Sequence, residues 1–338
     1  MRKLFIPLGL TITGLIVSLV GLEVAFRIYE RIIPPAGSWS DRPDFYFKHE
    51  GSETLQDYPY PAAKSPGAFR IAVVGDSYSF APYMQFTDAF PKKLEQMLNL
   101  NLSSSRAEVI NYGVPGYSTS HEVDKTALAI EQQADLILLQ ITLNDPELKP
   151  YTPTGIRDFS RFGALKPSPV MEAVFGYWHS LAFVANRLHN TKTVREYTDY
   201  FLDLFENPKT FKPWQRSLSR IVELCGERQI KLAAVVFPLF GLPLNDSYPF
   251  HRAHQIVQSE LNSRNIPYID LYSLYAGIPL ERIQVIPGED RHPNEIAHRM
   301  AAEAIYSWLR DQDLLPEDLI IRHKFKGRTQ LIKEEPAE

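Results

Sequence analysis

The chain has 338 residues, 44% of them hydrophobic, which is more than one ordinary domain of ~150 residues and enough for a large buried core. Its formal net charge of −4 at pH 7 provides no basic field for a nucleic-acid backbone, so nucleic acid is not expected as a partner. The single cysteine, Cys225, excludes an intrachain disulfide and a cysteine-rich metal site. We therefore expect one main domain with attached segments.

The amino-terminal residues 4–22 contain no charged side chain and are rich in leucine, isoleucine and valine. As a helix rising about 1.5 Å per residue they would extend about 28 Å, close to the ~30 Å hydrocarbon core of a bilayer. No A-x-A cleavage site follows, which favours an uncleaved signal anchor over a cleaved signal peptide or a buried core helix. We expect a single-pass inner-membrane protein whose main domain is extracytoplasmic, in the periplasm.

Composition divides the rest of the chain. We expect a transmembrane anchor over residues 1–31, a proline-rich stalk or linker over 32–69, the main domain over 70–314 and a disordered tail over 315–338. Within 70–314, short apolar runs alternate with amphipathic stretches, a pattern typical of the βα units of a parallel sheet. Strands are predicted at residues 71–74, 108–111, 136–141, 231–237 and 267–270, and helices at 89–100, 120–133, 213–228, 249–264 and 295–309.

Residues 151–212 interrupt this alternation with a polar and aromatic segment. One interpretation is a helical insertion beside the carboxyl ends of the strands, where open parallel sheets place their ligands and where aromatic rings would line an acyl group or stack on a sugar. The alternative is a helical patch of ordinary core.

Ser77 follows the first predicted strand in the run Gly75-Asp76-Ser77 and precedes a helical stretch. A serine on such a turn is exposed at the carboxyl edge of the sheet, which is a nucleophile's position, although the same pattern alone is typical of a helix N-cap. A serine hydroxyl needs a base, and His292 lies just before the last helix with Asp290 two residues earlier.

Two further strand ends carry groups that can stabilise an oxyanion. Gly113 follows the second strand and Asn144 the third, and a glycine amide and an asparagine carboxamide can both donate to a developing negative charge. No cofactor and no metal are expected, because the pair His251 and His254 lacks a nearby third ligand.

Taken in order, Gly-Asp-Ser, Gly113, Asn144 and Asp-x-His-Pro-Asn resemble the four blocks of the SGNH/GDSL hydrolases, of the membrane-anchored bacterial type. The likeness covers about residues 70–309. It implies a flavodoxin-like three-layer α/β/α sandwich around a parallel five-stranded sheet. It also implies Ser77 as nucleophile, His292 as base, and an oxyanion hole formed by the Ser77 amide, Gly113 and Asn144.

The carboxylate of the triad departs from the family pattern, because Glu289 stands three residues before His292 where many members have aspartate. Pro293 biases His292 towards an extended backbone, in which side chains two apart face the same way. That argument favours Asp290 over Glu289, although a turn at Gly288 would let Glu289 reach the ring.

The leading functional hypothesis is a serine esterase that removes an acyl group, O-acetyl above all, from a cell-envelope or exported glycan. An O-acyltransferase with the same acyl-enzyme is the first alternative, and a non-catalytic glycan-binding or assembly protein of the same fold is the second. The absence of G-x-S-x-G, Walker A and G-x-G-x-x-G motifs disfavours an α/β-hydrolase, a P-loop enzyme and a dinucleotide enzyme.

Overall fold

A computed structural model describes residues 2–32, 57–100, 106–148, 168–287 and 290–320. Its centre is a five-stranded, wholly parallel sheet in the order β2-β1-β3-β4-β5, so the predicted fold class is confirmed. The strand order reverses at β1, which is where open α/β sheets of this type bind their ligands. The strands are β1 (Ala68–Val74), β2 (Arg106–Asn111), β3 (Leu136–Ile141), β4 (Lys231–Val236) and β5 (Tyr268–Asp270).

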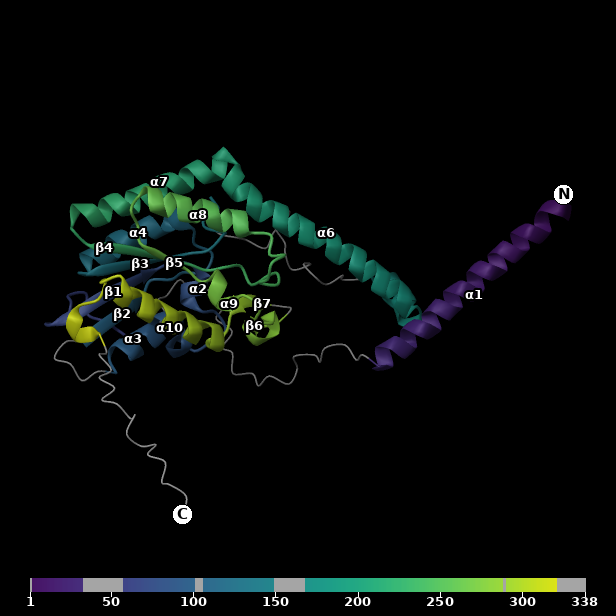
Figure 1. The fold of residues 1–338 in the computed structure, drawn as a ribbon, viewed down its shortest axis with the longest axis horizontal. Coiled ribbons are helices and arrows are strands. Elements are labelled where there is room, and N and C mark those ends of the chain that lie inside the picture. The colour runs from purple at the N-terminus through teal and green to yellow at the C-terminus, as the bar shows by residue number, and fades with distance from the viewer. Residues whose placement is uncertain (1, 33–56, 101–105, 149–167, 288–289, 321–338) are drawn as a thin grey trace, which may run out of the picture.

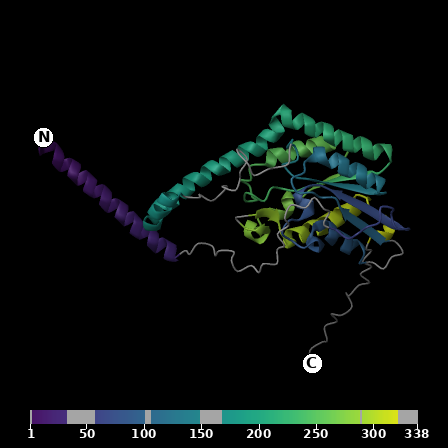
Figure 2. The ribbon, with the colours of Figure 1, turned by 180° about the vertical axis from the view of Figure 1, so that it is seen from behind.

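Helices cover both faces of the sheet and make the three layers (Figure 1). On one face lie α4 (Thr119–Glu131), α7 (Pro208–Glu227) and α8 (His251–Ser263), and on the other α3 (Phe90–Leu98) and α10 (Glu295–Asp311). Figure 2 shows the same layers from behind. The shorter elements are α2 (Ser77–Phe80), α9 (Tyr272–Tyr275), the hairpin strands β6 (Gln284–Ile286) and β7 (Asp290–Pro293), and 3₁₀ turns at Phe86–Asp88, Leu280–Arg282 and Glu317–Leu319.

The hydrophobic core fills the space on both sides of the sheet. Every residue of β3 is buried, because helices cover both of its faces and leave no solvent side on which polar residues could alternate. Gln140 is the polar residue within this strand, and its side chain bonds to the turn after β1. The apolar residues of β3 thus form part of the core, and its Gln140 holds the turn that carries the candidate site.

The segment before β1 is predicted as a stalk or linker over residues 32–69, and its described part, residues 57–67, is packed on the domain. Asp57 lies 2.6 Å from the buried ammonium of Lys92, and Tyr60 donates a 2.5 Å hydrogen bond to Glu95. The guanidinium of Arg70 donates to the carbonyl oxygen of Pro61 at 3.0 Å. Residues 57–67 therefore belong to the folded domain, because buried charges on α3 and β1 need partners from them.

The carboxyl-terminal boundary also differs from the expectation. The disordered tail was placed at residues 315–338, but Leu315 and Leu319 are buried against the core. The folded chain therefore continues through the turn at Glu317–Leu319. Residues 321–338 lie outside the described part.

Two long helices lie outside the sheet layers: α6 runs out from the domain, and α1 lies at its far end (Figure 1). The first helix, α1 (Arg2–Ile32), contains a stretch, Leu10–Tyr29, that is long and apolar enough to cross a membrane, a property that a signal sequence shares. The insertion forms α5 (Pro169–Tyr177), α6 (His179–Glu206) and the start of α7, while residues 151–167 lie outside the described part.

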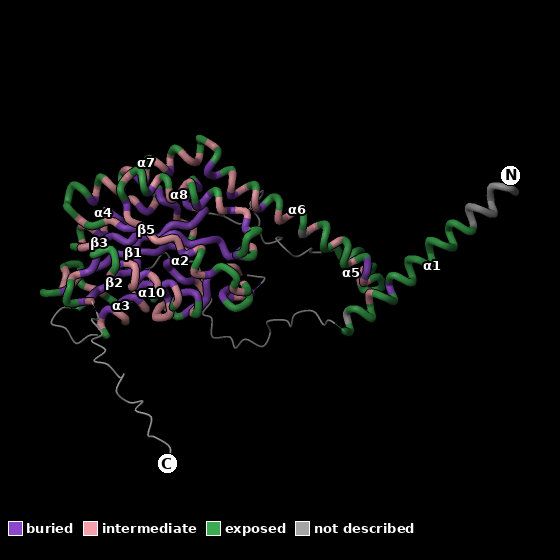
Figure 3. Tube along the Cα trace, viewed as in Figure 1, coloured by how far each residue is buried: buried purple, intermediate pink, exposed green. Residues whose placement is uncertain are grey.

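Only the carboxyl-terminal half of α6 lies on the domain, so neither interpretation of the insertion holds for the whole of it. Its carboxyl-terminal half buries the rings of Tyr197, Phe201 and Phe205 in the core. Its amino-terminal half runs away from the sheet to the end of α1 and is largely exposed (Figure 3). Apolar side chains of the first half of α6 are exposed, whereas those of the second half pack against the core of the domain.

Candidate active site

The nucleophile candidate Ser77 is the first residue of α2, directly after β1. The preceding Asp76 is fully buried, accepts the Tyr78 amide at 2.8 Å and the Thr142 hydroxyl at 2.7 Å, and donates its own amide to Gln140 at 3.0 Å. These bonds tie the turn to β3 and leave the half-buried Ser77 at its tip. Asp76 is therefore structural in this arrangement.

His292 and Asp290 reach Ser77 from the hairpin strand β7, more than 200 residues along the chain. His292 Nε2 lies 2.8 Å from Ser77 Oγ, and His292 Nδ1 lies 2.7 Å from Asp290 Oδ1. Since the carboxylate accepts from Nδ1, Nε2 is left as the acceptor for the serine proton. The structure thus brings the three predicted residues into a Ser–His–Asp relay, while Glu289 lies outside the described residues.

The electrostatics of this relay suit a base. Burial disfavours the charged imidazole, but the Asp290 carboxylate outweighs it and raises the pKa of His292 above its usual value. Burial likewise works against the ionised Asp290, and its contacts with His292 overcome that cost and lower the pKa of the carboxyl. Asp290 is thus ionised at neutral pH and can stabilise an imidazolium.

Two of the three predicted oxyanion donors are available. Among the described residues, the amide of Ser77 and the carboxamide NH₂ of Asn144 have no hydrogen-bond acceptor. Asn144 Oδ1 lies against the Thr142 hydroxyl, whose one proton is shared among this oxygen, Asp76 and Asp145, and the NH₂ group of Asn144 is the end that can donate to an oxyanion.

Gly113, the third predicted donor, has its amide engaged by the Asn111 side-chain oxygen at 3.0 Å. A Cβ built on Gly113 would lie 2.6 Å from Ser79 Cβ and 2.7 Å from the Phe80 nitrogen, so glycine here permits close packing of the loop on α2. Gly116, three residues on, has a φ of 77°, and its amide has no acceptor in the described chain. The sequence signal for Gly116 was present in the same Gly-Val-Pro-Gly run.

A buried polar layer beneath Ser77 was not foreseen from the sequence. Asp145 accepts the Thr119 hydroxyl at 2.9 Å and the Thr142 amide at 3.3 Å, and Glu122 is buried beside it. Burial first, then the charge of Asp76, raises the pKa of Asp145 well above its usual value. Protonation of Asp145 would therefore avoid a second buried negative charge below the nucleophile turn.

Aromatic and basic groups surround the imidazole. The ring centroid of Tyr78 lies 5.5 Å from that of His292 and its side chain is buried, which holds the imidazole in place. Arg291 lies between the two triad residues in the chain, and burial lowers its pKa. Tyr197 of α6 reaches the same region, because it interacts electrostatically with both Arg291 and Tyr78.

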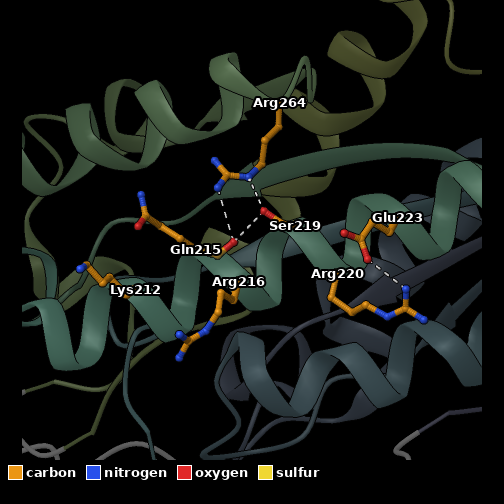
Figure 4. A pocket seen from close by; sticks show the side chains of 7 residues that line it. All are labelled: Lys212, Gln215, Arg216, Ser219, Arg220, Glu223 and Arg264. Atoms are coloured by element: carbon orange, nitrogen blue, oxygen red, sulfur yellow. Dashed lines mark hydrogen bonds and ion pairs between the residues drawn. The ribbon is translucent and has the colours of Figure 1, made fainter.

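A separate open groove lies on the outer surface of α7 and the end of α8 (Figure 4). Arg264 bonds to the Ser219 hydroxyl and the Glu260 carboxylate, and Arg220 pairs with Glu223. None of the triad or oxyanion residues lines it, and its arginines are partly neutralised. The lining residues are Lys212, Gln215, Arg216, Ser219, Arg220, Glu223 and Arg264.

A second histidine–aspartate pair lies at the end of β5, where His254 Nδ1 is 2.7 Å from Asp270 Oδ2. No serine or cysteine completes it among its hydrogen-bond partners in the described chain, which are Gln258 and the Tyr272 amide. No group of three metal-ligating side chains occurs within residues 2–32, 57–100, 106–148, 168–287 and 290–320.

Comparison with known proteins finds similarity at the level of solved structures. No family model and no curated protein matches the chain. Structures of hydrolases do match: a protein of Desulfitobacterium hafniense DCB-2 assigned to the G-D-S-L lipolytic family is 12% identical, with 71% of this chain and 99% of that chain covered and a TM-score of 0.42.

The cold-adapted esterase EstA of Pseudoalteromonas sp. is 13% identical over 73% of this chain and 99% of its own, with a TM-score of 0.43. A two-domain esterase active on acetylated mannans is 13% identical over 73% of this chain and 50% of its own, with a TM-score of 0.41. Similarity of this degree does not support a function. The functional argument depends instead on the distances within the site.

Proposed function

We propose that this chain is a serine ester hydrolase of the SGNH/GDSL type, with Ser77 as nucleophile, His292 as base and Asp290 as the carboxylate of the triad. The observation that carries the proposal is the unbroken relay from Asp290 Oδ1 through both ring nitrogens of His292 to Ser77 Oγ, at 2.7 and 2.8 Å. Such distances are those of a nucleophile and base in hydrogen-bond contact.

The chemistry follows from the direction of these bonds. Ser77 Oγ attacks the ester carbonyl carbon while its proton passes to His292 Nε2, and Asp290 stabilises the imidazolium that forms. The carbonyl oxygen becomes an oxyanion, for which the Ser77 amide and the Asn144 NH₂ are available donors, and the Gly116 amide in the loop after β2 is a third candidate. Collapse of the intermediate expels the alcohol, which takes the proton from His292, and leaves an acyl-Ser77 that water then hydrolyses.

The proposed location favours a particular substrate class. With α1 across the inner membrane and the domain on its periplasmic side, the domain would lie among esters of cell-envelope or exported glycans, and an O-acetyl group would be the acyl group removed. Transfer of the same acyl group to a sugar hydroxyl is the alternative reaction, because it shares every step up to the acyl-enzyme. A glycan-binding protein without activity is the alternative from another class.

A fluorophosphonate probe tests the proposal without knowledge of the substrate, because it labels only an activated serine. We expect the full-length protein to be labelled at Ser77 and Ser77→Ala to remain unlabelled. Labelling of the wild type at another serine would overturn the assignment of Ser77, and no labelling at all would leave the non-catalytic alternative. Incubation with acetylated glycans, with and without a sugar acceptor, then separates hydrolysis from transfer through the ratio of free acetate to acetylated acceptor.

A further inference from the structure

The first part of the insertion presents apolar side chains to the outside (Figure 3). Within residues 169–188 the only side chains with a permanent charge are Glu172 and Arg187. The exposed fraction is 75% for Val170 and 67% for Leu188. The other large exposed side chains of this surface are Met171, Val174, Tyr177, Trp178, Leu181, Phe183 and Val184. An apolar surface of this kind marks a site of contact with another apolar phase or protein.

The corner between α5 and α6 is fixed to α1 by two charged side chains. Glu23 of α1 accepts the amides of His179 and Ser180 at 3.0 and 2.9 Å and the Ser180 hydroxyl at 2.7 Å. It thus serves as the cap of α6, whose own N-cap residue Trp178 contributes no side-chain bond. Arg27 holds Glu23 at 2.8 Å and donates to the Tyr177 carbonyl at the end of α5, also at 2.8 Å.

These bonds place the apolar surface beside the end of the predicted span. Glu23 and Arg27 lie in the carboxyl-terminal part of the Leu10–Tyr29 stretch, and Phe26 contacts Phe183 with ring centroids 4.9 Å apart. Tyrosine and tryptophan, here Tyr177 and Trp178, are enriched where a bilayer meets water. Only 6% of the candidate span of α1 is buried, and α5 and the first turns of α6 lie beside its carboxyl-terminal end (Figure 3).

Charged residues along α6 mark where the apolar surface ends. After Leu188 the helix carries Lys192, Arg195, Glu196 and Asp199, and Lys192 and Glu196 are exposed and paired at 3.7 Å. From Tyr197 onwards the apolar side is buried on the domain. The apolar exposed segment thus ends where the polar, domain-bound segment begins.

We infer that residues 169–188 rest in the lipid of the bilayer interface beside the end of α1, as a second membrane contact. The helix α6 then forms an arm that begins in the membrane and ends on the domain, and its residues 189–196, about 12 Å long at ~1.5 Å per residue, join the two parts. This inference rests on the proposed location of α1 in the membrane. We assign lipid as the partner of this surface because it lies beside the apolar surface of α1. The buried Glu23 cap fixes α1 and α6 to each other, so both should lie at a similar depth in the bilayer.

Lipid quenching in the full-length protein tests the inference. Cys225 is buried and is replaced by alanine, after which single cysteines at Val174 and Leu181 carry an environment-sensitive fluorophore. The protein is reconstituted in vesicles of phosphatidylethanolamine and phosphatidylglycerol that contain a lipid with a doxyl quencher on its acyl chain. Leu15→Cys in α1 is the membrane reference, and Glu196→Cys, about 22 Å beyond Leu181 along α6 at ~1.5 Å per residue, is the matched polar control.

We expect Val174→Cys and Leu181→Cys to lose fluorescence to an extent similar to Leu15→Cys, with little loss at Glu196→Cys. Quenching at Leu15→Cys alone would overturn the inference and leave the anchor intact. No quenching at Leu15→Cys would overturn the anchor and the inference together. Rapid disulfide formation between protein copies at Val174→Cys without lipid quenching would assign the surface to a second copy and so overturn the lipid contact.

Discussion

Replacement of Asp290 by asparagine tests whether this carboxylate acts in the proposed catalytic triad or only stabilises the hairpin strand β7. The carboxylate oxygen lies 2.7 Å from His292 Nδ1 and 2.9 Å from the His292 amide. Asparagine can still accept from that amide, so β7 keeps a local bond. What disappears is the negative charge that faces the imidazolium when Ser77 gives up its proton.

The loss can be worked out from this geometry. Two unit charges about 4 Å apart attract with ~4 kcal/mol at an effective dielectric constant of about 20, a value that suits an Asp290 side chain that is 20% exposed. At about 1.4 kcal/mol for each tenfold, that alone lowers kcat by about 10³-fold. If the carboxamide instead turns its NH₂ group towards Nδ1, the tautomer with a proton on Nδ1 is lost as well, and the total should approach the ~10⁴-fold loss known for triad aspartates.

The pH profile provides a second, independent signature. Asp290 raises the pKa of His292 against the opposing effect of burial, so removal of its charge lets that pKa fall. Because only the neutral imidazole can accept the serine proton, the acid limb of kcat/KM should move to lower pH in Asp290→Asn. A variant damaged only in its fold would lose activity without this displacement.

The assay is the initial rate on p-nitrophenyl acetate across pH, with thermal melting to show that each variant is folded. Glu289→Gln tests the rival carboxylate, and Asp270→Asn is the matched control, since Asp270 also pairs with a histidine but one without a serine. Asp290→Asn that keeps kcat within tenfold of wild type would refute the reasoning. A greater loss in Glu289→Gln would transfer the role to that residue.

Four further changes have expected outcomes. Ser77→Ala should abolish ester turnover without lowering the melting temperature, measured on the same ester by rate and melting. Asn144→Ala should raise the activation free energy by about 2.7 to 4 kcal/mol if its NH₂ binds the oxyanion, seen in kcat with KM little changed. Gly113→Ala should lower both kcat and melting temperature, because its Cβ would meet the backbone of α2 at 2.7 Å. Arg70→Ala should destabilise the fold by about 3–5 kcal/mol in urea, because it leaves Glu108 buried without its partner at 2.7 Å.

The sheet could be predicted from sequence because parallel strands covered on both faces appear as short, continuous apolar runs. The run at residues 136–141 was predicted with the bounds that β3 has. The hairpin β6–β7 was not predicted, since three or four residues with mixed polarity give no periodic signal. The extended backbone at His292 was nevertheless expected, because Pro293 restricts the residue before it.

The site residues could be predicted where they stand at strand ends, because the topology of a parallel sheet brings those ends to one edge. The residues that hold these elements in place by hydrogen bonds could not be predicted. Gln140 looked like one polar residue in an apolar strand, and only its bonds to the Asp76 amide and the Ser79 hydroxyl reveal why it is there. Glu23 looked like the polar end of a span, whereas its partner Ser180 lies 157 residues away in the chain.

The arm and the nucleophile are parts of one connected structure. The membrane arm α6 continues into α7, whose Trp214 donates its indole NH to the Thr119 hydroxyl at 3.1 Å. That hydroxyl in turn donates to Asp145 at 2.9 Å, within the buried layer beneath Ser77. Because each of these groups is buried and hydrogen-bonded, rotation of α7 relative to the sheet would leave polar groups without partners at a cost of about 1–3 kcal/mol each. The direction in which α6 leaves the domain is therefore fixed relative to Ser77. If residues 169–188 rest in lipid, the same bonds fix the orientation of the active site towards the membrane.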